Sequence, residues 1–221
     1  MTTPQDRNVE RAAKMDTATL SDALDKLGIA GQCYRIKPRD VEFRMAGRAW
    51  TLLYGPAGNP PGTVGDYIDE VPPGSVIVLD NGGRDDATVW GDILTEIAYQ
   101  RGIAGTLIDG VCRDTRLCRS LGYPIFSKDH WMRTGKDRVQ VEATGVPVNI
   151  GNARVAPGDI VKGDCDGVIV IPKEHEDRVL DTAEAIEAAE DQIRSAVRGG
   201  MRLDEARKQF KYHQLQTREA K

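Results

Sequence analysis

The stretch GDILTEIAYQRGIAGTLIDGVCRDT, residues 91–115, decides the fold. Residues 89–102 predict a helix that ends at Gly102. One face of this helix is apolar and is formed by Ile93, Leu94, Ile97 and Ala98. The short apolar runs GSVIVLD (74–80) and GTLID (105–109) predict strands before and after the helix. At this spacing, strand, helix and strand form a βαβ unit with parallel strands.

Further elements extend from this unit in both directions. DTATLSDALDKLG (16–28) predicts a first helix, capped by Asp16 or Thr17 and stopped by Gly28. MAGRAWTLLY and PIFS predict additional strands, and a second helix is expected from Thr115 to Gly122. Residues 139–172 are rich in strand formers and turn signals, which indicates several short strands.

The C-terminal part differs from the rest because residues 174–198 contain no glycine or proline and predict one long helix. A short helix, LDEARKQF, follows Gly199 and Gly200. An apolar seam is formed by Val179, Ala183, Ile186, Ile193 and Val197. Glu190 occupies the position that would complete this seam. Its carboxylate therefore either reaches water at the seam edge or needs a cationic or hydrogen-bonding partner.

Composition restricts the class of protein. The chain has 221 residues, a net charge of −4 and a pI of about 5.5, which argues against a nucleic-acid-binding surface. The apolar runs are of strand length, so neither a signal peptide nor a membrane span is expected. The four cysteines have no metal-site or disulfide spacing, which favours buried, reduced thiols and a cytoplasmic protein.

The end of the central strand carries the candidate chemistry. Ligands bind beyond the carboxyl ends of parallel strands, where helices begin. Gly91 and the first amides of the following helix form a candidate site for a small anion. Arg113 and Asp114 follow the next strand and add a cation and a hard oxygen ligand. Neighbours in an extended segment point to opposite sides, so we expect each of the two to serve a different partner.

Other polar residues are assigned structural or surface roles. The three histidines have no ligand spacing among them, and the three lysines of the central region lie in polar or turn-like sequence, which argues against a Schiff-base aldolase. These residues are His130, His175 and His213, and Lys128, Lys136 and Lys162. Gly82-Gly83 is expected to form a turn lining the site, with Asp80 supporting it from behind.

Here the sequence resembles a known family. Asp92, twenty intervening residues and then Arg113-Asp114 match the D-x20-R-D signature of the 4-hydroxy-4-methyl-2-oxoglutarate aldolase group. This group lies within the RraA-like family, named after regulator of ribonuclease activity A. The resemblance continues in TATLSDALDKLG near the start and in APGDIVKGDCDGVIVIP before the final helices. Several separated blocks in the same order are more specific than the signature alone.

The resemblance implies an α/β protein, an αββα sandwich of the swivelling-domain type with a C-terminal helical extension. The implied division is a catalytic domain, 1–173, and an extension, 174–221, that packs on the body or on a neighbouring subunit. The implied activity is a divalent-metal-dependent class II aldolase. It would release pyruvate from a 4-hydroxy-2-oxo acid of the 4-hydroxy-4-methyl-2-oxoglutarate or 4-carboxy-4-hydroxy-2-oxoadipate type, and would also act as an oxaloacetate decarboxylase. Homotrimers or homohexamers with sites at subunit interfaces are expected, without nucleic-acid or membrane partners.

Site roles also follow from the resemblance. Asp114 would bind Mg²⁺ or Mn²⁺, and Asp92 would hold the water shell of that metal. Gly91 with the amides of Ile93 and Leu94 would bind the pyruvate carboxylate, and Arg113 would face the keto oxygen. A glutamate from the neighbouring subunit's C-terminal helix completes the family's site. Because of its place on the seam, Glu190 is the first candidate and Glu187 the second.

Two alternatives remain open. The family's namesake regulates an RNA-degrading enzyme, so a non-catalytic, protein-binding regulator of a ribonuclease is the second hypothesis. The third is an aldolase for a sugar-acid or aromatic-degradation intermediate. Trp90 stands where smaller residues are common in the family, and Arg84, Asp85 and Asp86 crowd the preceding loop. These four side chains are candidates for lining the pocket beyond the pyruvyl unit.

Overall fold

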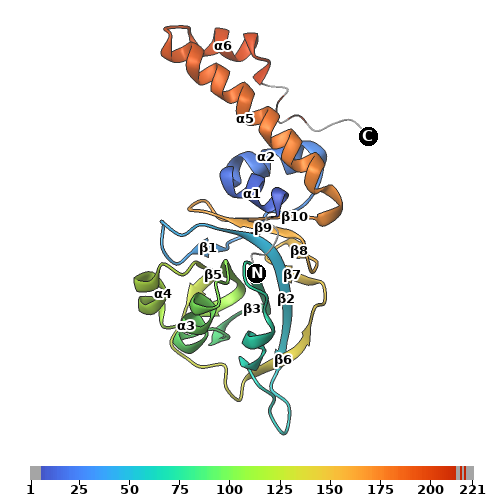
Figure 1. The fold of residues 1–221 in the computed structure, drawn as a ribbon, viewed down its shortest axis with the longest axis vertical. Coiled ribbons are helices and arrows are strands. Elements are labelled where there is room, and N and C mark those ends of the chain that lie inside the picture. Colours follow the sequence, from blue (N-terminus) through green and yellow to red (C-terminus); the bar gives the residue numbers. More distant parts are fainter. Residues whose placement is uncertain (1–5, 213–214, 216, 218–221) are drawn as a thin grey trace.

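One strongly curved, eight-stranded mixed sheet dominates the structure (Figure 1). The computed structural model describes residues 6–212, 215 and 217. The strands of this sheet are β1 (Lys37–Pro38), β2 (Met45–Pro56), β3 (Val76–Thr88), β4 (Gly105–Cys112), β5 (Ile125–His130), β6 (Val139–Thr144), β9 (Ile160–Gly163) and β10 (Val168–Ile171). Their order is β1-β5-β4-β3-β2-β9-β10, and β6 also pairs with β2.

The centre of the sheet is parallel. β2, β3, β4 and β5 run in the same direction, each beside the next. Helix α3 (Asp92–Gln100) connects β3 to β4, and α4 (Thr115–Leu121) connects β4 to β5. The two helices pack side by side (Figure 1). The predicted βαβ unit is confirmed, and the starts of both helices lie at the edge where β3 and β4 end.

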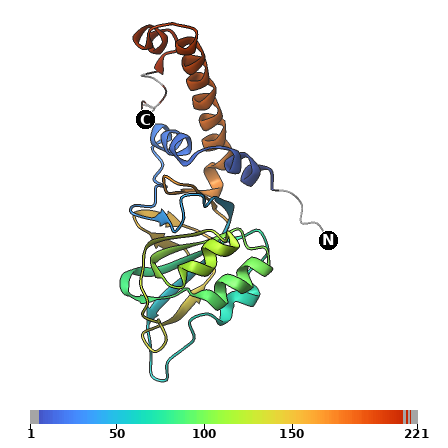
Figure 2. The same cartoon turned by 90° about the vertical axis from the view of Figure 1, so that its left-hand side faces the viewer.

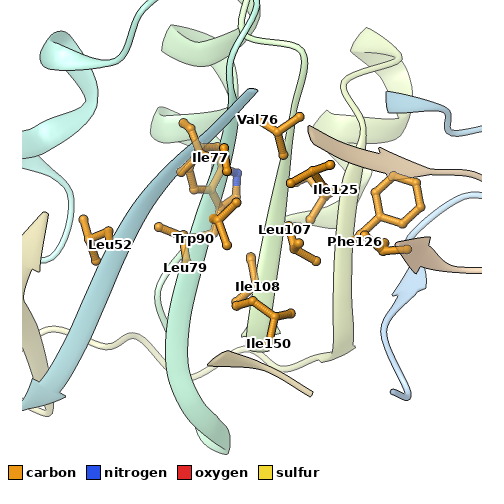
Figure 3. Close-up of a cluster of buried hydrophobic side chains, with 14 of the residues drawn as sticks. Leu52, Val76, Ile77, Leu79, Trp90, Leu107, Ile108, Ile125, Phe126 and Ile150 are labelled. Atoms are coloured by element: carbon orange, nitrogen blue, oxygen red, sulfur yellow. The ribbon is translucent and has the colours of Figure 1, made fainter. Parts of the chain in front are cut away.

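Strand β4 is the most enclosed element, since all eight of its residues are buried. On the side away from α3 and α4, a hairpin of β7 (Val148–Ile150) and β8 (Ala153–Val155) covers β3 and β4. Figure 3 shows Ile150 of this hairpin beside Ile108 of β4. On the other side, Trp90 stacks on Tyr123, and its indole N–H donates to Thr95 Oγ1 at 2.9 Å. Trp90 is therefore mainly a core residue.

A second apolar cluster joins the terminal helices to β9 and β10. It contains α1 (Arg7–Lys14), the expected α2 (Thr17–Leu27) and the first half of α5 (Glu176–Arg198). The sequence analysis did not predict α1, an eight-residue helix whose contacts with α5 include ion pairs. Its Arg11 donates to Asp181 at 2.6 Å and to Glu184 at 2.8 Å, both on α5.

Helix α5 projects from the body, and α6 (Leu203–Gln209) packs against its far end (Figures 1 and 2). Four of the five seam residues are buried, whereas the fifth, Val197, is exposed. Glu190 is half-buried, and its Oε2 accepts a hydrogen bond from Arg194 at 2.7 Å. Its cationic partner therefore belongs to its own helix. The division at residues 173 and 174 stays a prediction.

The predicted α/β class with a C-terminal helical extension is confirmed. Two short 3₁₀ helices, η1 (Asp66–Glu70) and η2 (Lys173–His175), complete the elements of the described residues. Within those same residues, each helix is too short or too polar to cross a membrane.

Candidate active site

The end of β4 brings Arg113 and Asp114 together. The amide of Arg113 donates to the carbonyl of Trp90 at 2.9 Å, which ties the strand end to the residue before Gly91. Asp114 has a φ of 57°, in the left-handed region that aspartate tolerates better than most residues. This turn brings Arg113 Nε to 3.2 Å from Asp114 Oδ2, and the two side chains form an ion pair. The expectation that the two side chains point apart was wrong, because the extended geometry ends at Asp114.

The start of α3 meets this pair directly. The amide of Asp92 donates to Asp114 Oδ2 at 3.2 Å, and the amide of Ile93 donates to Asp92 Oδ1 at 2.8 Å. The first two amides of α3 thus already bind carboxylates of the chain, as expected where a helix dipole favours negative charge. A Cβ on Gly91 would lie 2.9 Å from Asp114 Oδ2 and 3.1 Å from Arg113 Nε. Only glycine leaves the pair undisturbed.

Solvent reaches this arrangement. The side chains of Arg113 and Asp114 are each 39% exposed, so a ligand could contact both. Ile93 is 71% exposed, so the apolar face predicted for this helix is not buried at its first turn. It belongs to the first turn of α3, beyond the edge of the sheet, where little packs above it. The buried positions of α3 are Thr95 and Ala98.

Two cavities meet at Arg113. The first, the α3 cavity, has a volume of about 490 Å³ and lies between α3 and η1. Its walls include Trp90, Gly91, Asp92, Ile93, Leu94, Asp66, Asp69 and Thr134. The second, the Trp131 cavity, has a volume of about 400 Å³. It is lined by Arg113, Asp114, His130, Trp131 and Met132.

His130 was set aside on sequence grounds, but the structure places it at the wall of the Trp131 cavity. Cys112 pairs with His130 across β4 and β5, so the residue after each strand emerges at the same edge. If the sequence analysis had paired the strands at 105–109 and 124–127 in parallel, it would have indicated that His130 lies at this edge. His175 lies before α5 as a partly exposed residue, and His213 lies outside the described residues.

Residues expected near the site have other partners. Asp80 is buried and accepts hydrogen bonds from the amides of Gly82 and Asn149, both at 2.9 Å. It supports the Gly82-Gly83 turn, where both glycines have positive φ. Beside that turn, Lys128 Nζ lies 2.6 Å from Asp109 Oδ1. None of these groups is among those lining the two cavities.

Lys162 was placed in polar surroundings, and this was wrong. Its side chain is buried on β9, and its Nζ donates to the carbonyl of Ala13 at 3.0 Å. Burial lowers the pKa of Lys162, an effect that Asp164 and Asp16 oppose. The ammonium group holds the end of α1 against the sheet and is absent from the lining of both cavities. The lysine that a Schiff-base enzyme would need is therefore not supplied by Lys162.

A second acidic group lies at the turn after β9. Asp164, Cys165 and Asp166 place possible ligand atoms within 4.8 Å of one another, and this is the group with metal-ligand spacing among the described residues. Asp164 is already engaged by the Thr17 amide at 2.7 Å, the Thr17 hydroxyl at 2.6 Å and the Asp166 amide at 3.0 Å. Cys165 is exposed, unlike the three buried cysteines, which corrects the expectation of four buried thiols.

Glu190 lies apart from this edge in the same chain. Helix α5 packs on α1 and α2 and projects from the body, whereas α3 and the end of β4, beside which the cavities lie, belong to the body (Figures 1 and 2). The expectation that Glu190 reaches a site on a neighbouring subunit stays a prediction. Glu187, the second candidate, is an exposed residue of the same helix.

Known proteins are similar to this chain in sequence and in architecture. Protein DlpA of Legionella pneumophila is 38% identical over 209 residues, which cover 93% of this chain and 34% of DlpA. The chain thus spans about a third of the length of that relative. A protein of Halalkalibacterium halodurans, named as a candidate 4-hydroxy-4-methyl-2-oxoglutarate aldolase, is 34% identical over 82% of this chain and 84% of its own.

A solved structure extends the likeness. RraAS2 of Streptomyces coelicolor, described as an unusual member of the RNase ES inhibitor RraA protein family, superposes with a TM-score of 0.78. It is 28% identical and the match covers 86% of this chain and 97% of that one. Residues 17–170 match the model of one family. This range includes Asp92, Arg113 and Asp114, which line one or both of the cavities. The chain belongs to the RraA-like family, described as Aldolase/RraA.

Proposed function

We propose that the protein is a metal-dependent class II aldolase that cleaves a 4-hydroxy-2-oxo acid to pyruvate and also decarboxylates oxaloacetate. One observation carries the proposal: the start of α3, Arg113 and Asp114 converge on one accessible point between two cavities. Both reactions leave an electron pair on a pyruvate enolate. A fixed cation beside an anion-binding helix start is suited to that charge.

Asp114 fits a divalent metal. Its Oδ2 is held by Arg113 and by the amide of Asp92, while the half-exposed carboxylate still faces the Trp131 cavity. One carboxylate with room for water and substrate oxygens suits Mg²⁺, which is bound through few protein ligands; Mn²⁺ has similar requirements. When bound, the metal would supply Lewis-acid stabilisation of the enolate charge. The group at Asp164 fits less well because its buried carboxylate already accepts three hydrogen bonds from the chain.

The chain's own groups bind and orient the substrate. The pyruvyl carboxylate would take the place of the Asp92 side chain at the amide of Ile93 and extend to the amide of Leu94. Arg113 would then donate to the keto oxygen, where negative charge develops as the bond breaks. Gly91 allows this close approach because it has no side chain between the helix start and Arg113.

Displacement of Asp92 from the amide of Ile93 gives this carboxylate a second role. Freed from the amide, it would orient the water that removes the proton from the C4 hydroxyl and returns a proton to C3 of the enolate. In the ligand-free arrangement the same carboxylate stabilises the helix start. Asp92 would therefore alternate between these two partners.

The test is pyruvate release from oxaloacetate and from several 4-hydroxy-2-oxo acids, measured with Mg²⁺ and with EDTA. We expect EDTA-sensitive turnover, and a loss of roughly 10²–10³ in kcat for Arg113→Met. Arg116→Met, at an exposed arginine that is the second residue of α4, is the matched control and should retain full activity. Turnover that survives EDTA, or an unaffected Arg113→Met enzyme, would refute the mechanism.

We extend the proposal to the assembly, in which Glu190 of a neighbouring subunit completes each site of a homotrimer or homohexamer. Mixed assemblies test this directly. If the sites are shared, chains carrying Arg113→Met and chains carrying Glu190→Gln should regain activity when unfolded together and refolded. Each variant alone should be weak. Failure of the mixture to exceed the sum of the separate variants would place Glu190 outside the site.

A protein-binding regulator of a ribonuclease is the second candidate, and the likeness to the Streptomyces protein favours it. The same assays separate the two. A regulator needs neither EDTA-sensitive turnover nor Arg113. Absence of pyruvate release from all substrates, together with inhibition of a ribonuclease by the purified chain, would support this candidate.

A further inference from the structure

Two buried polar side chains lie behind the start of α3. Trp90 precedes the helix and Thr95 is its fourth residue, and they are 2% and 1% exposed. The indole N–H of Trp90 donates to Thr95 Oγ1 at 2.9 Å, and this hydroxyl donates to the carbonyl of Gly91, also at 2.9 Å. The amide of Thr95 donates to the same carbonyl at 3.1 Å. One residue of α3 thus holds the Gly91 carbonyl with two hydrogen bonds.

The direction of these hydrogen bonds follows from the groups involved. An indole N–H is a donor only, so the oxygen of the Thr95 hydroxyl accepts from Trp90. The single proton of that hydroxyl is then directed to the Gly91 carbonyl. Hydrogen bonds in such a series polarise one another and strengthen each other. Trp90 therefore orients the hydroxyl that holds Gly91.

The series continues to Asp114 through one peptide group. The carbonyl of Gly91 and the amide of Asp92 belong to the same planar unit, so the orientation of one fixes the orientation of the other. That amide donates to Asp114 Oδ2 at 3.2 Å. Thr95 thus sets the orientation of the peptide group at its carbonyl end, and Asp114 is bound at its amide end.

The peptide group before Gly91 is also fixed. The carbonyl of Trp90 accepts from the amide of Arg113 at 2.9 Å. The Trp90 ring stacks on Tyr123, with centroids 6.1 Å apart and 4° between the ring planes. Both peptide groups that flank Gly91 are therefore held by hydrogen bonds, although glycine itself restricts the backbone least.

We infer that Thr95 is a positioning residue for the metal, which acts on Asp114 through the Gly91–Asp92 peptide group, and that Trp90 orients its hydroxyl. Groups that support a metal ligand from behind fix its orientation, and their loss weakens metal binding. Thr95 is absent from the lining of both cavities, so its effect has to pass through the backbone. The inference rests on the proposed function, which makes Asp114 the metal ligand.

Titration of the purified protein with Mn²⁺, with the free ion followed by its EPR signal, tests the inference. Thr95→Val removes the hydroxyl and should raise the Kd for Mn²⁺ about tenfold, whereas Thr95→Ser keeps the hydroxyl and should stay within about twofold of wild type. Pyruvate release should show the same separation. The Mg²⁺ concentration for half-maximal rate should rise about tenfold in Thr95→Val, and kcat at saturating Mg²⁺ should change little.

Thr106→Val is the matched control. The Thr106 hydroxyl is buried and lies 2.8 Å from the Tyr123 hydroxyl, so this variant also loses a buried hydrogen bond beside the stacked rings. It should lower the melting temperature as Thr95→Val does, but leave the Kd for Mn²⁺ unchanged. Trp90→Phe keeps an aromatic ring on Tyr123 and lacks the N–H donor. It should raise the Kd roughly threefold, and it decides the test if Thr95→Val does not fold.

The outcomes separate this inference from the proposed function. If Asp114→Asn abolishes Mn²⁺ binding while Thr95→Val and Trp90→Phe bind like wild type, the inference alone is overturned. An equal rise of the Kd in Thr106→Val would trace the effect to a loosened core and would also overturn it. Absence of Mn²⁺ binding in the wild type, or binding that Asp114→Asn leaves intact, would overturn it together with the metal site of the proposed function.

Discussion

Two aspartates receive the first amide of a helix, yet their surroundings differ. Asp114 Oδ2 accepts from the first residue of α3 at 3.2 Å, and Asp164 Oδ2 accepts from the first residue of α2 at 2.7 Å. Asp164 is 2% exposed and has two further donors, from the Thr17 hydroxyl and the Asp166 amide. Asp114 is half-exposed, has a left-handed backbone and lines a cavity beside an arginine.

The difference separates a structural carboxylate from a functional one. A buried carboxylate must have its hydrogen bonds filled by the protein, and Asp164 meets this requirement. A carboxylate that is to bind a metal must retain an accessible oxygen, as Asp114 does. Ligand spacing alone would have chosen the group at Asp164, whereas the state of its hydrogen bonds argues for Asp114.

The strongest test of this contrast is Asp114→Asn. We expect a loss of about 10³ in kcat/KM for pyruvate release, roughly 4 kcal/mol of transition-state stabilisation, because a neutral amide is a poor metal ligand. The melting temperature should hardly change, since asparagine also tolerates a positive φ. Asp137→Asn is the control, as Asp137 is exposed and has a φ of 63°. Wild-type activity in Asp114→Asn would remove Asp114 from the site.

The converse test is Asp164→Asn, which should cost about 2 kcal/mol in the free energy of unfolding. The new amide cannot accept from both the amide and the hydroxyl of Thr17 as the carboxylate does. Urea unfolding measures the effect, with Asp166→Asn, an exposed neighbour, as the control. The folded variant should keep its kcat. An unchanged stability with lost turnover would reverse the two assignments.

The sequence predicted the regular elements around β4 well. Gly28, Gly102 and Gly122 end helices α2, α3 and α4 where their sequence positions indicated. These three positions have a positive φ, a local property that glycine allows. The spacing of Asp92 and Arg113 also predicted that they lie at the same edge of the sheet. Helix α3 leads the chain away from this edge, and β4 returns it there.

What the sequence missed depends on tertiary contacts. The Arg113–Asp114 pair forms through one left-handed residue, which no periodicity reveals in a non-glycine position. Lys162 is buried because α1, itself unpredicted, covers β9 and supplies the carbonyl of Ala13. His130 reaches the site through the register of β4 with β5. The positions of Lys162 and His130 depend on contacts between segments far apart in the chain, which the sequence patterns do not specify.

A smaller effect is expected for Gly91→Ala. The new Cβ would displace Asp114 Oδ2 and Arg113 Nε, which lie 2.9 and 3.1 Å from its position. Because both atoms belong to side chains that can shift, the pair should move without disrupting the fold, and kcat should fall about tenfold. The φ of −145° suits any residue, so stability should be retained. Gly199→Ala, beyond the end of α5, is the control, and equal kcat in both would show that close approach is unimportant.

The smallest effect concerns acid and sharpens the assignment of Asp164. Burial raises the pKa of Asp164, but hydrogen bonds from Thr17 and from the Asp166 amide outweigh it and hold the pKa below its usual value. A folded pKa below the unfolded value of about 3.9 means that the native state binds fewer protons. The stabilisation is therefore present above about pH 4 and is lost as pH falls through the lowered pKa.

Asp164→Asn lacks this titration, so urea unfolding at a series of pH values isolates it. The difference in stability between wild type and variant should be constant near pH 6 and should shrink below about pH 4. Other carboxylates, such as Asp6 and Glu184, also have lowered pKa values, but they titrate in both proteins and cancel in the difference. A stability difference that stays constant down to pH 2 would mean that the negative charge of Asp164 contributes nothing to stability. The effect of Asp164→Asn would then come from the change in hydrogen-bonding groups alone.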